Sequence, residues 1–328
     1  MRRRNTFVDL GRAALLAWLI PGATSALGAE LAPGSWGKRA ELIEANSEFA
    51  VAETGGTIYV LGGYPANRQS VTTVQIYDTK SDTWRLGPPL PQPNNHGMAA
   101  AVEGVIYLIG GQTDPATAYV DTVYALDPKI GRWVEKAPMP SKRSAGVALV
   151  LGGKIYVAGG RPPRGNDFAV YDPAVDRWET LPPLPSQRNH IAGAVIGSRM
   201  LVVGGRLGGG FQSELTAVTE YFDPASRTWT SGAALPRPRS GINGAMAFGC
   251  FHVWGGEHTT GVFPDHDVYD PRAGRWTKLP DMPLPVHGVT GAAFVDGLIR
   301  VVGGGTSQGG SSGSKLNQVY RPAIRCDQ

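Results

Sequence analysis

Residues 171–178 read YDPAVDRW, and a phrase of the same form occurs four more times in this chain of 328 residues. In every copy a Trp follows an Asp after six positions, and the residue before the Asp is large and apolar. An Asp side chain accepts hydrogen bonds from the amides just beyond it, so the phrase predicts a tight turn joining two strands. A fixed interval that recurs indicates a repeated structural unit. The five pairs are Asp78 and Trp84, Asp127 and Trp133, Asp172 and Trp178, Asp223 and Trp229, and Asp270 and Trp276.

A second feature, an apolar run ending in Gly-Gly, repeats with the first. These runs are too short for helices and rich in β-branched residues, which indicates strands. A run of small and apolar residues, such as GVALVL at 146–151, precedes each of them, so every unit offers four strands. The Gly-Gly runs occupy residues 58–63, 106–111, 155–160, 200–205, 251–256 and 299–304, and successive copies lie 45 to 51 residues apart.

The combined Gly-Gly, Tyr-Asp and Trp pattern resembles the kelch-repeat family over residues 34–322. The resemblance implies an all-β fold, a six-bladed β-propeller of four-stranded antiparallel blades. The last repeat ends before any Trp, whereas Trp36 lies 48 residues before Trp84. We therefore expect the N-terminal strand to complete the final blade and close the ring.

The first 29 residues have the pattern of an export signal. MRRR is followed by the uncharged stretch AALLAWLIPGATSAL at 13–27 and then by small residues. The stretch is broken by Pro21-Gly22 and is shorter than the ~20 apolar residues of a spanning helix, which disfavours a stable membrane anchor. The expected organisation is a signal peptide at 1–29 and a propeller at 30–328, in a periplasmic or secreted protein. The alternative is an N-terminal segment that stays attached.

The net charge of +4 gives no case for a nucleic-acid partner. Residues 1–29 hold four arginines against Asp9, so the remaining chain carries only about +1. A nucleic-acid surface would need a concentrated basic patch.

Candidate site residues come from aligning the repeats by their Gly pairs. In kelch proteins, positions near the blade starts and just past the Gly pairs line a ligand-binding mouth. At the blade starts the alignment superposes Glu48, His96, Ala145, His190 and Gly241, with Gly288 or Val289 in the last blade. The predicted ligand-binding residues are Glu48, His96, Gln112, Arg161, His190, Arg206, Glu257 and His258.

Clustered Arg and His favour an anionic or polyhydroxylated ligand, since like charges repel unless a carboxylate neutralises them. Arg143, Arg188 and Arg239, two positions before the blade-start residues, could equally tie blades together. No catalytic residue, cofactor or metal is predicted. The loop at 256–267, which contains His258 and His266, is a weak candidate for a metal site.

Three functions fit a kelch propeller, because the fold alone implies none. The first, which we favour, is a binding module for a small polar or anionic ligand, such as a sugar acid, or for a protein partner. The second is a sugar-acid mutarotase similar to the exported sialic-acid epimerases. The third, a copper radical oxidase like galactose oxidase, needs a Cys linked to a Tyr. It is disfavoured because the only cysteines, Cys250 and Cys326, are expected to form a disulfide in an exported protein, the alternative being two free thiols.

Overall fold

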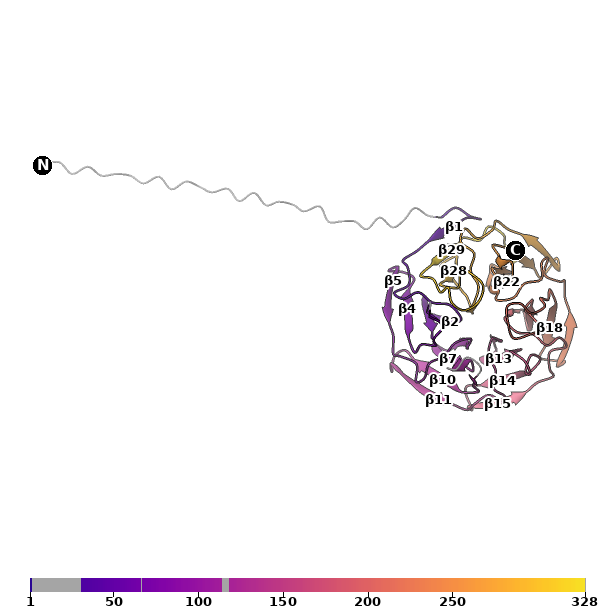
Figure 1. Ribbon diagram of the computed structural model, residues 1–328. Helices are drawn as coiled ribbons and strands as arrows, with labels where there is room; N and C mark the ends of the chain where they lie inside the picture. Colours follow the sequence, from indigo (N-terminus) through magenta and orange to yellow (C-terminus); the bar gives the residue numbers. More distant parts are fainter. Residues whose placement is uncertain (2–30, 66, 114–117, 328) are drawn as a thin grey trace. The chain divides into compact units, whose positions relative to one another are not determined.

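The computed structural model describes Met1 and residues 31–65, 67–113 and 118–327, so the predicted signal segment lies outside the described residues. Residues Leu31–Gln328 form one compact unit. Within the described ranges every regular element is a β-strand. Six antiparallel sheets of four strands, one of them extended by a two-residue strand, form the blades of a β-propeller around a central axis (Figure 1).

The first three blades follow the chain from its inner to its outer strand. The first consists of β2 (Phe49–Thr54), β3 (Thr57–Leu61), β4 (Val74–Asp78) and β5 (Thr83–Leu86). The second consists of β6 (Met98–Val102), β7 (Val105–Ile109), β10 (Val123–Asp127) and β11 (Arg132–Lys136), with the small hairpin β8 (Gln112–Thr113) and β9 (Ala118–Tyr119). The third consists of β12 (Val147–Leu151), β13 (Lys154–Ala158), β14 (Phe168–Asp172) and β15 (Arg177–Thr180).

The remaining blades repeat this order until the ring closes. The fourth consists of β16 (Ala192–Ile196), β17 (Arg199–Val203), β18 (Thr219–Asp223) and β19 (Thr228–Ser231). The fifth consists of β20 (Asn243–Ala247), β21 (Cys250–Trp254), β24 (His266–Asp270) and β25 (Arg275–Lys278), with the hairpin β22 (Glu257–His258) and β23 (Gly261–Val262). The sixth consists of β27 (Ala293–Val295), β28 (Leu298–Val302), β29 (Asn317–Tyr320) and β1 (Trp36–Lys38), while the short β26 (Val289–Thr290) pairs in parallel with β2.

The repeated phrase forms the hairpin between the third and fourth strands of a blade. Asp172 Oδ1 accepts a hydrogen bond from the amide of Ala174 at 3.0 Å, and Tyr171 lies opposite Trp178 in the ladder. Asp78, Asp127, Asp223 and Asp270 make the same turn contact in the other copies. The four residues 173–176 form the turn between the paired Asp172 and Arg177, and Trp178 follows opposite Tyr171. This geometry places every Trp six positions after its Asp.

Each of these Trp side chains also links two blades. The indole N–H of Trp178 donates to the carbonyl of Ala137, just past the outer strand of the preceding blade, at 2.8 Å. The equivalent bonds run from Trp84 to Ala40, Trp133 to Pro88, Trp229 to Pro182 and Trp276 to Ala233. The apolar core likewise lies between blades: Leu61 and Ile76 of the first blade pack with Leu108 of the second.

The N-terminal strand closes the ring, as predicted. Trp36 of β1 pairs with Tyr320 of β29, and the two strands lie side by side in Figure 1. The indole of Trp36 donates to the carbonyl of Pro280 at 3.3 Å, so it repeats the interblade bond of the other five tryptophans.

The Gly pairs allow neighbouring blades to approach closely. A Cβ on Gly62, whose φ is 63°, would lie 2.3 Å from the carbonyl oxygen of Asn94 in the next blade. Any side chain at this position would therefore displace the loop that carries the mouth residues.

The predicted disulfide is present. Cys250, at the start of β21, is bonded to Cys326 of the C-terminal tail, with 5.1 Å between the Cα atoms. The amide of Cys326 donates to the carbonyl of Phe248, which holds the tail against the fifth blade. In the part of the chain that the structure describes, no helix is long and apolar enough to cross a membrane.

Candidate functional site at the mouth of the central channel

Six residues, one from the start of each blade, form a closed ring of backbone hydrogen bonds around the axis. The amide of each residue donates to the carbonyl of its counterpart in the preceding blade, and the donor–acceptor distances include 2.7 Å for His96 to Glu48 and 3.3 Å for Gly288 to Gly241. All six residues have left-handed φ values, between 50° and 68°. The ring consists of Glu48, His96, Ala145, His190, Gly241 and Gly288, which resolves the alignment of the last blade in favour of Gly288.

Left-handed φ favours glycine, and a residue with a side chain costs on the order of 1 kcal/mol there. Two blades use Gly at this ring position and one uses Ala145, whereas the other three use Glu48, His96 and His190. Charged or titratable side chains are thus placed around the axis at a conformational cost, which is typical of functional positions.

Hydrogen bonds fix the tautomers of two of the histidines. The side-chain amide of Asn189 donates to the carbonyls of Arg206 and Gly208, so its Oδ1 accepts from Nδ1 of His190 at 2.6 Å. Asn95 holds Nδ1 of His96 in the same way. Both rings therefore carry their proton on Nδ1 when neutral. Nε2 of His190 then presents a lone pair to the site, whereas Nε2 of His96 lies 3.0 Å from Glu48 Oε2 and donates to that carboxylate when the ring is protonated.

A guanidinium group lies against the Nε2 atom of each of these histidines. Nη2 of Arg161 lies 2.9 Å from Nε2 of His96, and Nη2 of Arg206 lies 2.8 Å from Nε2 of His190. Burial lowers the pKa of His190 well below its usual value, and the nearby charges of Arg206 and Arg161 lower it further. A neutral His190 is therefore the acceptor that the Arg206 guanidinium requires.

Glu257 neutralises Arg206. Its Oε1 accepts from Nη1 of Arg206 at 2.8 Å, and its Oε2 accepts from the amide of Gly309 at 2.7 Å. Arg206 and Glu257 are 2% and 1% exposed, so this is a fully desolvated ion pair. It joins the fourth blade to the fifth.

Glu48 is held ionised. Burial alone would raise its pKa, but the attraction of His96, 3.0 Å away, together with that of His287 and Arg206, outweighs burial and keeps the pKa below its ordinary value. Burial also lowers the pKa of His96, although Glu48 opposes this shift. The mouth thus holds two carboxylates and two guanidinium groups within one hydrogen-bonded cluster.

Arg161 differs from Arg206 in having no carboxylate partner among the described residues. Among the described residues, no carboxylate oxygen lies within ion-pair distance of the Arg161 guanidinium, and its Nε has no hydrogen-bond acceptor. The side chain is partly exposed. Its guanidinium therefore faces the mouth as an open cation.

These groups line a cavity of about 350 Å³. Its lining includes Glu48, His96, Arg161, Arg206 and Glu257. Two glycine-rich loops, residues 206–215 from the fourth blade and 304–314 from the sixth, complete it. They and the first blade contribute Tyr64, Arg68, Gly209, Gly210, Phe211, Gln212, Gly309 and Gly310.

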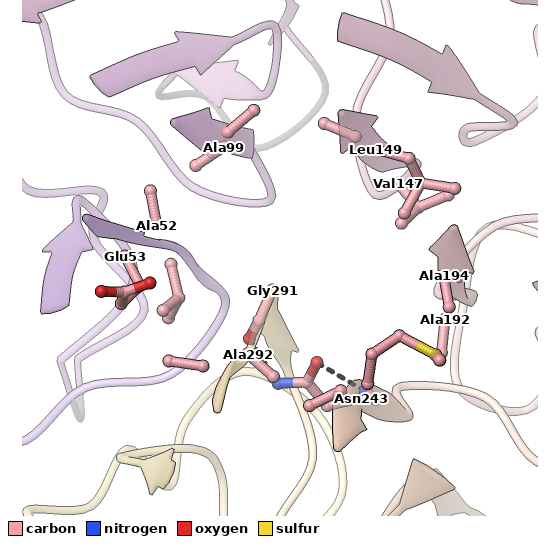
Figure 2. A pocket seen from close by; sticks show the side chains of 18 of the residues that line it. Ala52, Glu53, Ala99, Val147, Leu149, Ala192, Ala194, Asn243, Gly291 and Ala292 are labelled. Carbon is pink, nitrogen blue, oxygen red and sulfur yellow. Dashed lines mark hydrogen bonds between the residues drawn. The ribbon is translucent and has the colours of Figure 1, made fainter. Parts of the chain in front are cut away.

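Below the ring, the central channel is lined by small residues of the inner strands. Figure 2 shows Ala52, Ala99, Val147 and Ala192 facing a common space of about 340 Å³. Asn243 spans the gap between two blades by donating to the carbonyl of Gly291 at 2.6 Å. Because Glu48 directly precedes β2, the ring lies where this channel, lined mainly by small side chains, meets the mouth.

Three of the predicted site residues, Gln112, His190 and His258, do not line the cavity. Gln112 is fully buried behind the mouth, where its backbone pairs with Asn95 and its side chain does not line the cavity. His258 lies on the β22–β23 hairpin and contacts Thr259. His190 touches the cluster through Arg206 and packs edge-on against His96, with 5.1 Å between ring centroids.

Three buried arginines lie two positions before ring residues in the sequence, and their side chains form hydrogen bonds within their own blades. Nη1 of Arg143 donates to the carbonyls of Val157 and Asp167, and Nη2 of Arg239 donates to Asp267 Oδ2 at 2.5 Å. Arg188 likewise bonds the carbonyl of Val202 and the carboxylate of Glu220. Their role is therefore structural, but their side chains stabilise single blades and do not tie neighbouring blades together, as the sequence had suggested.

The metal candidate at 256–267 is not assembled. His266 is buried against Trp36 and Tyr320 in the blade wall, whereas His258 lies on the hairpin. Both cysteines are engaged in the disulfide, so neither can form the Cys–Tyr link of a copper radical oxidase.

Sequence reasoning did not assign His287 to the site. The ring of His287 is 1% exposed, and its Nδ1 lies 3.4 Å from Glu257 Oε2 and 3.6 Å from Glu48 Oε1. Phe211 was also missed, because only the fold brings the 206–215 loop over the axis. The sequence offered one indication for His287: it begins a His-Gly dipeptide at 287–288, as His96 does at 96–97.

Comparison with known proteins agrees with this geometry. A model of the KLHDC2/KLHL20/DRC7 Kelch-repeats domain matches residues 40–205, and a Kelch motif model matches residues 187–236. The chain therefore belongs to the kelch-repeat family.

Curated relatives match over short stretches. An F-box/kelch-repeat protein of Arabidopsis thaliana is 34% identical over 24% of this chain and 21% of its own length. Kelch-like protein 35 of Mus musculus is 38% identical over 24% of this chain and 13% of its own length. The chain thus spans about a fifth or less of these relatives.

Among solved structures, that of YjhT superposes with a TM-score of 0.72, covering 85% of this chain and 95% of that one at 16% identity. The likeness establishes the shared six-bladed fold.

Proposed function

We propose that this protein is an exported binding module whose propeller mouth binds a small anionic, polyhydroxylated molecule such as a sugar acid. Kelch propellers serve as binding scaffolds, and this chain has a polar cavity at the mouth of its channel. The proposal concerns the cavity, and a protein partner on the same face is its alternative.

The observation that carries the proposal is the open guanidinium of Arg161. The buried arginines Arg143, Arg188, Arg206 and Arg239 are paired with carboxylates or bonded to carbonyls. Arg161 contacts only Nε2 of His96 among the described residues, and Arg68, the other unpaired arginine of the cavity, lies on an exposed loop. A guanidinium binds a carboxylate through two parallel hydrogen bonds, each worth roughly 1.5–3 kcal/mol. A ligand carboxylate would complete the charge pairing of the mouth.

The rest of the cavity suits hydroxyl groups. Tyr64 and Gln212 offer donors and acceptors, the glycine-rich loops offer backbone amides, and Phe211 offers an apolar ring face. Few polar groups placed around one apolar surface are typical of small-molecule sites.

We favour binding over mutarotation. Anomer exchange requires a group that gives and takes a proton near neutral pH. The pKa of Glu48 is held below its ordinary value, and both oxygens of Glu257 accept hydrogen bonds, from Arg206 and from the amide of Gly309. Neither carboxylate is suited to donate a proton.

Export is supported by the disulfide between Cys250 and Cys326, since such bonds persist in oxidising compartments. The basic and apolar pattern of residues 1–29 agrees with it. Finding the mature chain, shortened near residue 29, in the periplasmic or secreted fraction would test this part of the proposal.

The ligand itself can be found by mass spectrometry of small molecules retained by the protein purified from that fraction. We expect a carboxylate-bearing compound with wild type and its loss with Arg161→Ala. Arg164→Ala is the matched control, because Arg164 is an exposed arginine on the same loop. Retention of the same compound by wild type and Arg161→Ala would contradict the assignment.

A further inference from the structure

We infer that Glu48, Glu257 and His287 form a binding site for one divalent transition-metal ion of the Zn²⁺ class. The site goes beyond the proposed function and does not depend on it. One ligand atom from each residue lies within 4.8 Å of the other two, and His287 Nδ1 lies 3.6 Å from Glu48 Oε1 and 3.4 Å from Glu257 Oε2. The three residues come from the first, fifth and sixth blades, which are consecutive around the closed ring.

The imidazole of His287 points to a cation. Its Nε2 donates to the carbonyl of Ser307 at 2.8 Å, so in the neutral ring Nδ1 carries a lone pair. That nitrogen is buried and has no hydrogen-bond partner among the described residues. It faces two carboxylate oxygens at 3.4 and 3.6 Å, and three electron-rich atoms are stable together when a cation lies between them.

The spacing fits a metal of the right size. Bonds of about 2.1 Å in a tetrahedral site place neighbouring ligand atoms about 3.4 Å apart. The two distances from His287 Nδ1 have this size. The fourth position would face the mouth, because Glu48 and Glu257 both line the cavity.

Each proposed ligand is oriented by a second group, as is usual around bound metals. His287 is fixed by the Ser307 carbonyl, Glu257 by Arg206, and Glu48 by His96 through its other oxygen. Glu48 also keeps a left-handed φ of 55°, at a ring position where the fifth and sixth blades use glycine.

A second group of three, Glu48, His96 and His190, is less suited to a cation. The Nε2 atoms of both histidines already contact the guanidinium groups of Arg161 and Arg206, whose charges would repel a metal. At the proposed site the adjacent guanidinium, that of Arg206, is neutralised by its ion pair with Glu257.

The donor set defines the class of metal. One imidazole and two carboxylates, with an open position for water, suit Zn²⁺ or Mn²⁺. Mg²⁺ prefers six oxygens in octahedral geometry and should bind poorly. Beside the cation, the open Arg161 would make the mouth more attractive to an anion.

The test is a titration of the full chain, stripped with EDTA, with Zn²⁺ alone by isothermal titration calorimetry at pH 7.5. We expect one ion per chain, at least tenfold weaker binding in both His287→Gln and Glu48→Gln, and unchanged binding in the control His258→Gln. Millimolar Mg²⁺ should not displace the ion.

Absence of one-to-one Zn²⁺ binding by the wild type would overturn the inference. The contacts of His287 with the two carboxylates would then be explained by a proton on its Nδ1. Unchanged affinity in His287→Gln, or equal affinity for Mg²⁺, would also overturn it. The wild-type stoichiometry decides the matter even if a variant fails to fold. Since no organic ligand is added, a negative result here leaves the test of Arg161 intact.

Discussion

At the scale of single residues, two arginines that occupy equivalent positions in the repeats have different partners at the mouth. Arg161 and Arg206 both follow a Gly pair, and both reach the Nε2 atom of a histidine. Only Arg206 has an internal carboxylate partner. Their equal spacing in sequence therefore hides different roles: Arg161 is available to a ligand, and Arg206 also holds two blades together.

Replacing these two arginines should change the free energy of unfolding by very different amounts. Arg206→Ala leaves Glu257 buried without its partner, so we expect a loss of about 3–5 kcal/mol in the free energy of unfolding. Arg161→Ala should change it by less than about 1 kcal/mol, because the side chain is partly exposed and has no ion pair among the described residues. Urea unfolding of the two variants measures the difference. Equal destabilisation would mean that Arg161 is also a tie between blades.

At the scale of the elements, β1 completes the last blade through Trp36. The side chain packs against Tyr320 and His266 and donates to Pro280 of the preceding blade. Because the ring is partly exposed, we expect Trp36→Ala to cost about 3 kcal/mol, at the lower end for aromatic truncations. An unchanged melting temperature would contradict closure by this strand.

The disulfide is a second closure at the C-terminal end. It joins residues 76 positions apart and holds the tail against the fifth blade. Reduction, or a Cys326→Ser variant, should lower the free energy of unfolding by roughly 2–4 kcal/mol. A melting temperature that does not respond to reductant, with the thiols shown by titration to be free, would refute this contribution.

The seam between the fifth and sixth blades should be sensitive to acid. His252 Nδ1 lies 3.0 Å from His266 Nε2, and Tyr320, Arg239 and Lys278 are the other titratable or charged groups facing the pair. Burial lowers the pKa of His252 from 6.5 to about 3. The unfolded chain therefore binds more protons between these values, so the stabilisation is complete above about pH 6.5 and is lost as the pH falls toward 3.

This dependence can be isolated by substitution. The difference in unfolding free energy between pH 7.5 and pH 4.5 should be smaller by a few kcal/mol in His252→Phe than in wild type. His258→Gln, on the exposed hairpin, serves as the control. The same difference in wild type and His252→Phe would show that the seam does not titrate.

At the scale of the whole molecule, the periodic phrases were sufficient to predict the propeller. The Asp-to-Trp interval sets the outer hairpin, the Gly pairs set the contact between blades, and the missing Trp of the last repeat indicated closure by Trp36. The Gly pair recurs in all six blades and the Asp-to-Trp phrase in five of them, and both are local in sequence, so a single chain reveals them.

The site was predicted less completely, because its contacts depend on how the last blade joins the first. The His-Gly dipeptides at 96–97 and 287–288 suggest that His287 is equivalent to His96, but Gly288 occupies that ring position. His287 instead corresponds to Asn95, and its backbone pairs with Gly305 as Asn95 pairs with Gln112. Gly288 lies 15 positions before Gly303, whereas His96 lies 14 positions before Gly110, so aligning the repeats by their Gly pairs misplaces the last blade by one residue.

The central claim, that the mouth recognises an anionic ligand through Arg161, is tested most directly by thermal melting with paired ligands. A panel of hexuronates, aldonates and simple dicarboxylates is compared with the corresponding neutral sugars for wild type, Arg161→Ala and Arg164→Ala. We predict that at least one carboxylate raises the melting temperature of wild type and Arg164→Ala, that its neutral counterpart does not, and that the shift disappears in Arg161→Ala. A shift of equal size in Arg161→Ala, or stabilisation by the neutral sugar alone, would contradict the account.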